Sequence, residues 1–327
     1  SVVATIDGPV TVIGEAATGL LIDGEAGTAA GAVTTEFTDA LGVNGIDARG
    51  LVVDLEAGTS TGAVTTDIAG NVTTEGDGST AVDIIVDAED AAGAVTTEVT
   101  GALGVNGTNA RGLAIAVDAG TNADAVTTDI TGNVTAEGEG AQALKIAVVA
   151  GGDVEAVATT IGGKIIAAGA QSTGAGISIE AIENAVPSTI NVADDIQVSS
   201  TGTDATALEL EFDIAKLIAP LEFDAGASII ASGVRSTGAL ITMSTSTELS
   251  DEALEVTTDY ALIANAEDAT GLSVKLENEA GTGSVVLSVG EDDETDGGIL
   301  AEGKGALGGA IEVLADSGST GAVGTTV

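Results

Sequence analysis

The amino-acid sequence repeats with a period of 31 residues, and this period limits the possible fold more strongly than any other feature. The segments 31–61, 62–92 and 93–123 align without a gap, and 124–154 continues the series. A fixed period of about 20–50 residues is typical of stacked repeats, in which each unit buries its apolar face only against its neighbours. We therefore expect a solenoid rather than the two globular domains that 327 residues would otherwise suggest.

Apolar residues recur in fixed columns of the repeat and alternate with polar or small ones, as in Leu51, Val53 and Leu55. Period-2 alternation with β-branched residues is typical of strands with one buried face. Each unit therefore predicts three short strands, at about 33–37, 41–43 and 51–55 in the second unit. The clearest columns are Val33, Val64, Val95, Val126 and Val157, then Phe37, Ile68, Val99, Ile130 and Ile161, then Leu41, Val72, Leu103, Val134 and Ile165.

Glycine and other small residues mark the corners between the strands. One column reads Gly45, Gly76, Gly107, Gly138 and Gly169, and another reads Gly50, Ala81, Gly112, Ala143 and Gly174. Identical glycines at one corner indicate either positive φ or no room for a Cβ atom, and we expect Gly107→Val to be destabilising through positive φ. Three strands and three corners per unit predict an all-β fold, a right-handed parallel β-helix (β-solenoid) of roughly triangular section. The handedness is the general preference of parallel crossovers.

The register covers the whole chain as one β-solenoid domain, 1–327. Residues 1–185 form regular coils, and the spacing lengthens from 31 to between 33 and 37 over 186–327, where we expect the extra residues to leave at corners as loops. This gives about ten coils of three short strands, in a rod about 50 Å long at about 4.8 Å per layer.

The composition excludes several classes of function. A formal charge of −43, from 51 acidic and 8 basic residues, opposes binding to nucleic acid or to an anionic membrane. The chain has no cysteine and no histidine, which excludes disulfides and thiolate or imidazole chemistry. No run of about 18 apolar residues is present, so we expect no membrane insertion by this segment.

Carboxylates and threonines also form columns. The acidic column, Glu36, Asp67, Glu98 and Asp129, is predicted to face outward, and its stacked like charges suggest Ca²⁺ as the one candidate cofactor. A solvated acidic face that blocks lateral aggregation is the interpretation we favour. Outward threonines (Thr34, Thr65, Thr96, Thr127) make an ice-binding face conceivable, and the inward column (Thr35, Thr66, Thr97, Thr128, Thr159) is expected to hydrogen-bond to itself or to backbone. Arg49 and Arg111 are expected to pair with a nearby carboxylate such as Asp47.

The one alternative that involves catalysis is a glycan-cleaving β-helix enzyme, whose groove would lie at residues 212–228 or 290–305. Such sites use paired carboxylates. They usually also supply aromatic platforms, whereas this chain has no tryptophan, one tyrosine and three phenylalanines. We therefore expect no enzyme activity.

Both ends of the predicted solenoid are open. The first strand of a coil already lies at 2–6, and 319–327 nearly repeats 60–68. Since a head-to-tail contact that does not close gives a filament, we expect a homopolymer. Its contact residues are Val2, Val3, Ile6, Ala322, Val323 and Val327. A slice of a longer solenoid is the alternative, and a start at Ser1 suits a processed product or a fragment.

The motifs AAGAQSTGAGISI (167–179) and IIASGVRSTGALI (229–241) resemble the passenger regions of Gram-negative autotransporters and related β-strand-repeat surface proteins. The resemblance implies export, display on the surface of a Gram-negative bacterium, and a role in adhesion, biofilm or a protective coat. The expected function is an extracellular structural protein, a subunit of a surface filament. The alternative is the monomeric stalk of a cell-surface adhesin.

Overall fold

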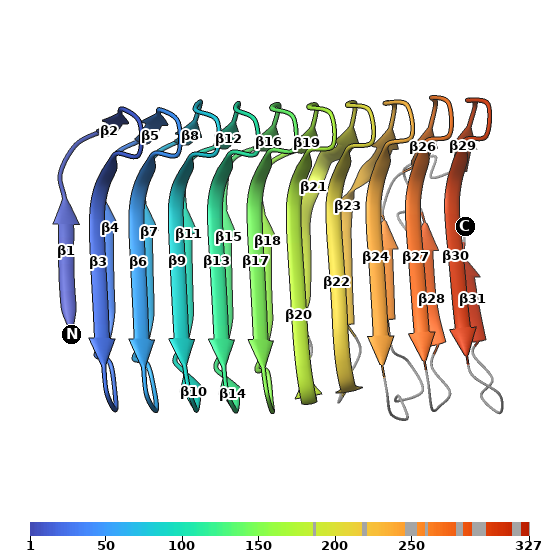
Figure 1. Ribbon diagram of the computed structural model, residues 1–327. Helices are drawn as coiled ribbons and strands as arrows, with labels where there is room; N and C mark the ends of the chain where they lie inside the picture. The colour runs from blue at the N-terminus through green and yellow to red at the C-terminus, as the bar shows by residue number, and fades with distance from the viewer. Residues whose placement is uncertain are drawn as a thin grey trace.

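The chain folds into a straight rod of stacked β-coils (Figure 1). The computed structural model describes residues 1–185, 188–217, 221–245, 254–258, 261–278, 284–289, 299–315 and 322–326. In these residues every regular element is a β-strand and the strands pair in parallel. Val33 pairs with Val64, and Val64 with Val95, so residues 31 apart lie directly over one another as the sequence predicts.

Each coil contributes a first, a second and a third strand in turn. The first strands are β1 (Val2–Ile6), β4 (Val33–Phe37), β7 (Val64–Ile68), β11 (Val95–Val99), β15 (Val126–Ile130), β18 (Val157–Ile161), β25 (Leu254–Thr258), β28 (Ser284–Val289) and β31 (Ala322–Thr326). The second strands are β2 (Val10–Ile13), β5 (Leu41–Asn44), β8 (Val72–Thr74), β12 (Leu103–Val105), β16 (Val134–Ala136), β19 (Ile165–Ala167), β26 (Leu262–Ala264) and β29 (Ile299–Ala301).

The third strands are longer than predicted, because the hydrogen-bonded ladder extends past the apolar residues at both ends. They are β3 (Thr18–Ala26), β6 (Arg49–Ala57), β9 (Thr80–Ala88), β13 (Arg111–Ala119), β17 (Gln142–Ala150), β20 (Thr173–Ala185), β22 (Thr206–Leu217), β24 (Thr237–Thr245), β27 (Thr270–Asn278) and β30 (Leu307–Ala315). Two short strands, β10 (Ala91–Ala92) and β14 (Asn122–Ala123), pair at the corner that follows.

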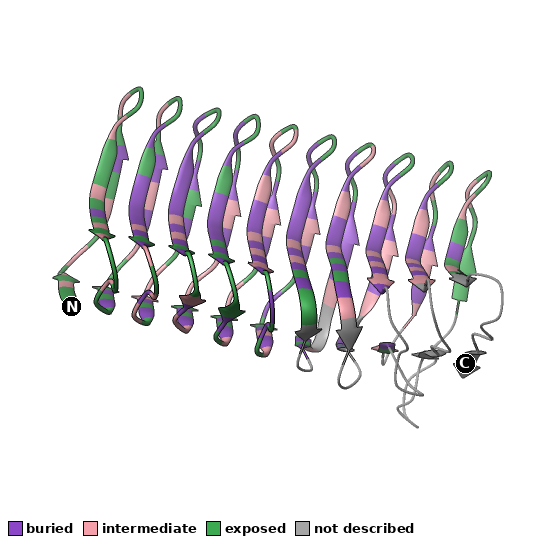
Figure 2. Ribbon diagram, turned by 60° about the horizontal axis from the view of Figure 1, so that its bottom comes forward, coloured by how far each residue is buried: buried purple, intermediate pink, exposed green. Residues whose placement is uncertain are grey.

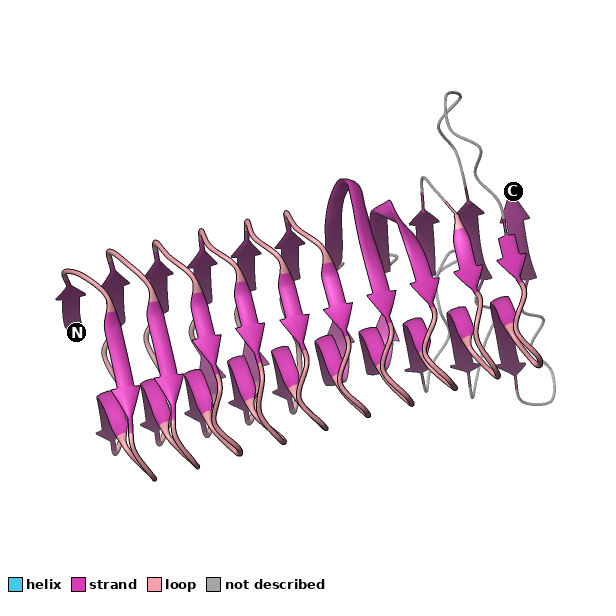
Figure 3. Cartoon of the chain, turned by 90° about the horizontal axis from the view of Figure 1, so that it is seen from above, coloured by secondary structure: helices cyan, strands magenta, loops and turns pink. Residues whose placement is uncertain are grey.

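The strands form two large sheets rather than three separate faces. First and second strands belong to one 19-stranded sheet, and the third strands form a 10-stranded sheet. In two coils the first and second strands are continuous, as β21 (Thr189–Ser200) and β23 (Leu221–Ala231). Figure 3 shows these two bent strands arching over the edge where the other coils have loops.

Between 186 and 231 the extra residues lengthen strands, which corrects the prediction that they leave as loops there. The extra residues of the later coils lie outside the described residues. β20 has 13 residues and β22 has 12, and their register shifts between Ala181 and Asn184. β21 and β23 shift likewise between Val192 and Ile196. Ten third strands mark ten successive coils, of which about eight are described over most of their circumference. The acidic run at 291–296 lies outside the described residues.

The main core is an apolar column that runs along the rod between the sheets, and Ala231, Ala264 and Ala269 form a small separate cluster. Along β4, Val33, Thr35 and Phe37 are buried while Thr34 and Glu36 are exposed, which is the predicted alternation. Phe212 and Phe223 also lie in this core. The first coil is more exposed than the coils behind it (Figure 2). Nothing from a neighbouring layer covers its outer side.

The glycine column at the corner is required by close packing, not by positive φ. A Cβ atom on Gly107 would lie 2.5 Å from the carbonyl oxygen of Gly76, and one on Gly138 would meet Gly107 in the same way. Gly107 is not among the residues with positive φ, so that part of the expectation is wrong. The other alternative, no room for a side chain, is confirmed.

Positive φ occurs two residues further on, in a column that the sequence analysis overlooked. Every coil places one residue there in the left-handed region, with φ between 52° and 72°. The column reads Ala16, Asp47, Gly78, Asn109, Gly140, Gln171, Asp204, Arg235, Asp268 and Gly305. Glycine, asparagine and aspartate tolerate this conformation best, and they fill seven of these ten positions. This composition is the signal that could have located the turn.

Candidate functional site

The outer side of the first coil presents unpaired strand edges and exposed apolar side chains. β1, β2 and β3 each pair on one side only, with β4, β5 and β6. Val2 is 47% exposed, and Val3 and Ile13 are each 75% exposed. Ile6, the third predicted contact residue of this coil, is partly buried against the core. An open parallel edge of this kind is a template for another strand.

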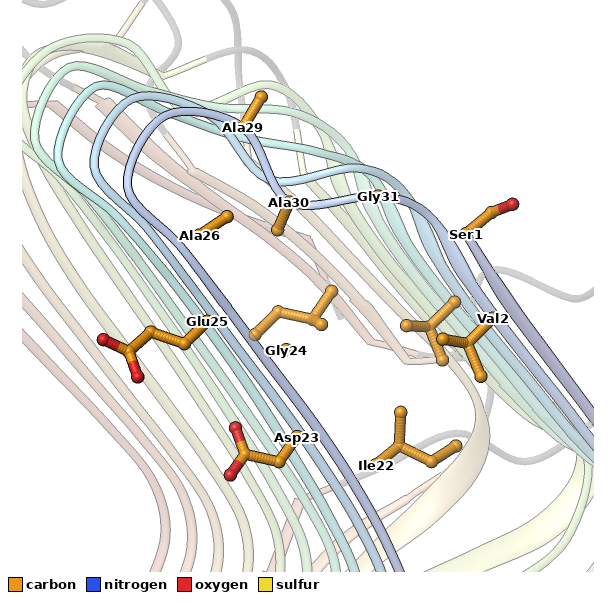
Figure 4. Close-up of a pocket in the computed structure, with 12 residues that line it drawn as sticks. Ser1, Val2, Ile22, Asp23, Gly24, Glu25, Ala26, Ala29, Ala30 and Gly31 are labelled. Carbon is orange, nitrogen blue, oxygen red and sulfur yellow. The ribbon is translucent and has the colours of Figure 1, made fainter.

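A hollow of about 150 Å³ opens on this same side of the coil (Figure 4). Figure 4 shows Val2 and Ile22 pointing into the space between the strands, whereas Asp23 and Glu25 point away from it. The hollow exists because Gly24 stands in a column that elsewhere holds Leu55, Val86 and larger residues. It therefore offers an apolar recess to a side chain from a further coil.

The predicted contact residues at the other end lie in β31. Ala322 pairs with Ser284 and Val323 with Val285 of β28, so β31 occupies a first-strand position. Val327 lies outside the described residues. The two predicted groups are thus at opposite ends of the rod, as head-to-tail contact requires (Figure 1).

The four residues of the acidic column form a ladder along the sheet of first and second strands. Glu36 pairs in register with Asp67, and Asp67 with Glu98, which pairs with Asp129. Three of the four side chains are exposed, and Asp67 is half-buried. Within the described part of the chain, no group of three or more acidic side chains is arranged to hold a metal ion. The four carboxylates project in a line and do not converge on a common point.

The inward threonine column does not form the hydrogen bonds that the sequence analysis expects. Its five hydroxyls, those of Thr35, Thr66, Thr97, Thr128 and Thr159, are buried and have no hydrogen-bond partner. The register explains this difference, because equivalent atoms in successive layers lie about 4.8 Å apart. A hydroxyl–hydroxyl hydrogen bond needs about 2.7–2.8 Å.

Arg49 pairs with a nearby carboxylate, as predicted, but the partner is Asp83 of the next coil and not Asp47. Nη1 of Arg49 and Oδ2 of Asp83 are 3.7 Å apart. Asp83 is largely buried on the outer face of the sheet that the third strands form, and its side chain is 17% exposed. Burial raises the pKa of the Asp83 carboxyl, the positive charges of Arg49 and Arg111 lower it, and the negative charge of Asp54 raises it further. The net direction is upward, so two arginines do not offset the loss of hydration.

This raised pKa predicts a pH dependence of stability. A carboxyl whose pKa is higher in the folded than in the unfolded chain destabilises the fold when ionised, and this penalty disappears as pH falls through the folded pKa. We expect Asp83→Asn to change the urea midpoint less between pH 7 and pH 4 than the wild type does. Glu98→Gln on the exposed ladder is the control. An equal pH response of Asp83→Asn and wild type would contradict the effect of burial.

A second hollow, of about 250 Å³, lies on the outer face of the sheet that the third strands form. The sequence analysis did not predict it. Gly176 forms its floor, with Lys145 on one side and Glu209 and Glu211 on the other. Burial raises the pKa of the Glu209 carboxyl, Glu211 adds to this effect and Lys145 opposes it. The signal in the sequence is a single glycine between larger residues in one outward column.

A glycan-cleaving enzyme would need an open groove and exposed aromatic side chains. Residues 212–217 and 221–228 belong to strands β22 and β23, so the first of the two predicted loop grooves is wrong. Residues 290–298 of the second lie outside the described residues. Phe37, Phe212 and Phe223 are buried in the core and offer no surface platform for a sugar ring.

Comparison with known proteins gives no relative for this chain. No protein-family model matches it, and neither a curated protein nor a solved structure is significantly similar. Among the described residues, no helix has the length and apolar character needed to cross a membrane.

Proposed function

We propose that this chain is an extracellular structural protein whose β-solenoids stack end to end into a surface filament. The observation that carries the proposal is the first coil, where unpaired strand edges surround an apolar hollow at Gly24. A second copy that stacks there pairs the edges and removes Val2 and the hollow from water. Both effects favour association, since unpaired edges and exposed apolar surface are otherwise costly.

The charge of the rod favours growth along its axis over lateral growth. Each copy carries −43, and the ladder from Glu36 to Asp129 lies along its side. Side-by-side contact would bring these ladders together, whereas end-to-end contact brings together the apolar ends. Because salt screens the remaining repulsion, we expect assembly to increase with ionic strength.

Display on the surface of a Gram-negative bacterium is part of this proposal and rests on the resemblance of 167–179 and 229–241 to autotransporter passengers. The same resemblance favours a second candidate, the monomeric stalk of a surface adhesin. The two differ in what covers the first coil. In the stalk it is a further coil of the same chain, and in the filament it is another copy.

Electron microscopy and light scattering of the 1–327 polypeptide test the filament. Wild-type protein is expected to form long threads of uniform width. Gly24→Lys places a charge in the hollow, and inward-pointing charges block edge association, so this variant is expected to remain as short rods. Gly104→Lys is the matched control, because a side chain there points into open space in the middle of the rod.

Two outcomes would count against the proposal. Isolated short rods of wild-type protein at every salt concentration would favour the stalk. Threads that form equally well with Gly24→Lys would show that the first coil is not the contact surface.

A further inference from the structure

We infer that the hollow at Gly176 is a binding site for a small zwitterion of the α-amino-acid class. The hollow lies on the outer face of the sheet that the third strands form, where β17, β20 and β22 run side by side (Figure 1). These strands belong to the middle of the rod. The inference therefore goes beyond the proposed filament and does not depend on what covers the ends of the rod.

The hollow exists because one outward column of the sheet lacks a side chain. Gly176 lies in register between Lys145 of β17 and Glu209 of β22, so the column has a gap one layer wide. Lys145 and Glu209 therefore stand two layers apart, with about 9.6 Å between their Cα atoms. The volume of about 250 Å³ is below the range of about 300–1,000 Å³ that is typical of pockets for drug-sized ligands, so the hollow suits a smaller molecule.

The polar groups around the gap differ in charge from one side to the other. β17 contributes Lys145 and the amide of Gln142, which can donate hydrogen bonds to an anion. β22 contributes the carboxylates of Glu209 and Glu211, which accept hydrogen bonds. A carboxylate therefore fits beside β17 and an ammonium group fits beside β22. A free α-amino acid carries both groups on one carbon atom, so it can contact both strands at once across Gly176.

Lys145 and Glu209 are both half-buried, and they do not neutralise each other. Within the part of the chain that the structure describes, neither side chain forms an ion pair or a hydrogen bond. Lys145 is thus an unpaired cation in a chain with 51 acidic and 8 basic residues. Burial removes water from the Glu209 carboxyl and raises its pKa, so an ammonium group beside it would replace contacts that the carboxylate has lost.

The lining also indicates which kind of cation fits. None of the described residues that line the hollow is aromatic, whereas quaternary ammonium groups are bound by aromatic cages. A primary ammonium group has three N–H donors instead. Glu209, Glu211 and the hydroxyl of Ser178 on β20 can accept these hydrogen bonds. The hollow therefore suits a free amino acid better than one with a fully methylated nitrogen.

Saturation-transfer NMR with the 1–327 polypeptide and L-alanine as the probe tests the site. Wild-type protein is expected to bind L-alanine. L-Alaninamide lacks the carboxylate and N-acetyl-L-alanine lacks the ammonium group. Each is expected to bind at least tenfold more weakly, because the charged groups of one strand are then left without a partner.

Three outcomes of this comparison would overturn the inference. Equal binding of L-alaninamide and L-alanine would show a cation site, and equal binding of N-acetyl-L-alanine and L-alanine would show an anion site. Absence of L-alanine binding at millimolar concentrations would show that the hollow is not a site for this class of ligand. None of these outcomes bears on the filament.

Gly176→Val fills the hollow without disturbing the fold. Beyond its chain neighbours, an added Cβ atom would come no closer than 3.7 Å, to Thr173 Cγ2, which is an ordinary contact. This variant is expected to keep the circular dichroism of wild type and to lose L-alanine binding. Gly104→Val is the matched control, since it fills an outward hollow on the other sheet. Binding that persists in Gly176→Val would place L-alanine elsewhere and overturn the assignment.

Two charge variants test the two ends of the ligand separately. Lys145→Met is expected to weaken L-alanine binding at least tenfold and to leave the weaker binding of L-alaninamide unchanged, since that probe has no carboxylate. Glu209→Gln is expected to weaken L-alanine binding and to leave that of N-acetyl-L-alanine unchanged. A folding defect would weaken all three probes alike. Wild-type affinity for L-alanine in either variant would show that its side chain does not hold the ligand, which overturns the zwitterion site.

Discussion

Gly107→Val is expected to lower the free energy of unfolding by about 1–3 kcal/mol or more, since overpacking against a rigid neighbour has costs of this size. The added Cβ atom would lie 2.5 Å from the carbonyl oxygen and 2.8 Å from the carbonyl carbon of Gly76, and 3.1 Å from Ala110 Cβ. The first two are backbone atoms of the preceding layer, which cannot move away without disturbing the stack. Urea denaturation followed by circular dichroism measures the change.

Gly104→Val is the matched control for this prediction. It makes the same substitution three residues earlier, in β12, where an added Cβ atom would meet nothing within 4 Å. Valine is a better strand residue than glycine, so the control is expected to be neutral or mildly stabilising. Equal stability of the two variants would show that the layers at this corner are not in close contact.

The triple substitution of Thr66, Thr97 and Thr128 by valine is expected to raise the free energy of unfolding by about 3 kcal/mol. Each of these hydroxyls is buried without a hydrogen-bond partner, and such a group costs about 1–3 kcal/mol. Valine keeps nearly the same shape while it removes the polar atom. The shift in the urea midpoint and in Tm measures the gain.

The outward threonines provide the control. Thr65, Thr96 and Thr127 lie one residue earlier on the same strands and are exposed to water. Their replacement by valine is expected to change stability by no more than about 0.5 kcal/mol per residue. If the inward triple variant were less stable than wild type, the buried hydroxyls would have to make hydrogen bonds, for example to internal water.

The stacking of layers could be predicted from the sequence because the repeat is regular and its alternation marks the buried face. The first strand of the second coil was located to the residue, at Val33–Phe37. The third strand was predicted too short, since Arg49 at its start is exposed and Ala57 at its end is a small residue, yet the two pair with Thr80 and Ala88. The backbone pairing of the third strand thus extends beyond the residues whose apolar alternation predicted the strand.

The extra residues after 186 could not be placed from the sequence. An insertion of two residues can leave as a loop or be absorbed by a bulge, and the apolar columns are the same in both cases. The structure absorbs it, with register shifts in β20 and β21. Both outcomes keep Ile190 and Phe223 in the same buried column.

The candidate site was predicted only in part. The repeat register correctly placed Val2 and Val323 in one column of first strands. The hollow was missed because it depends on the absence of a side chain at Gly24, in a column where only the apolar residues were considered. The positive-φ column was missed for a similar reason, since its residues, Asp47 and Asn109 among them, are polar and variable.

The parallel pairing of every layer with the next also determines how the rod would respond to mechanical load. Backbone hydrogen bonds between layers run along the rod axis, so a pull on its two ends loads all layers in series. Within a layer, the bonds of the two sheets share that force and would have to rupture together. Such a rod would therefore resist extension until its weakest layer separates, and the force at which this happens would not depend on the number of layers.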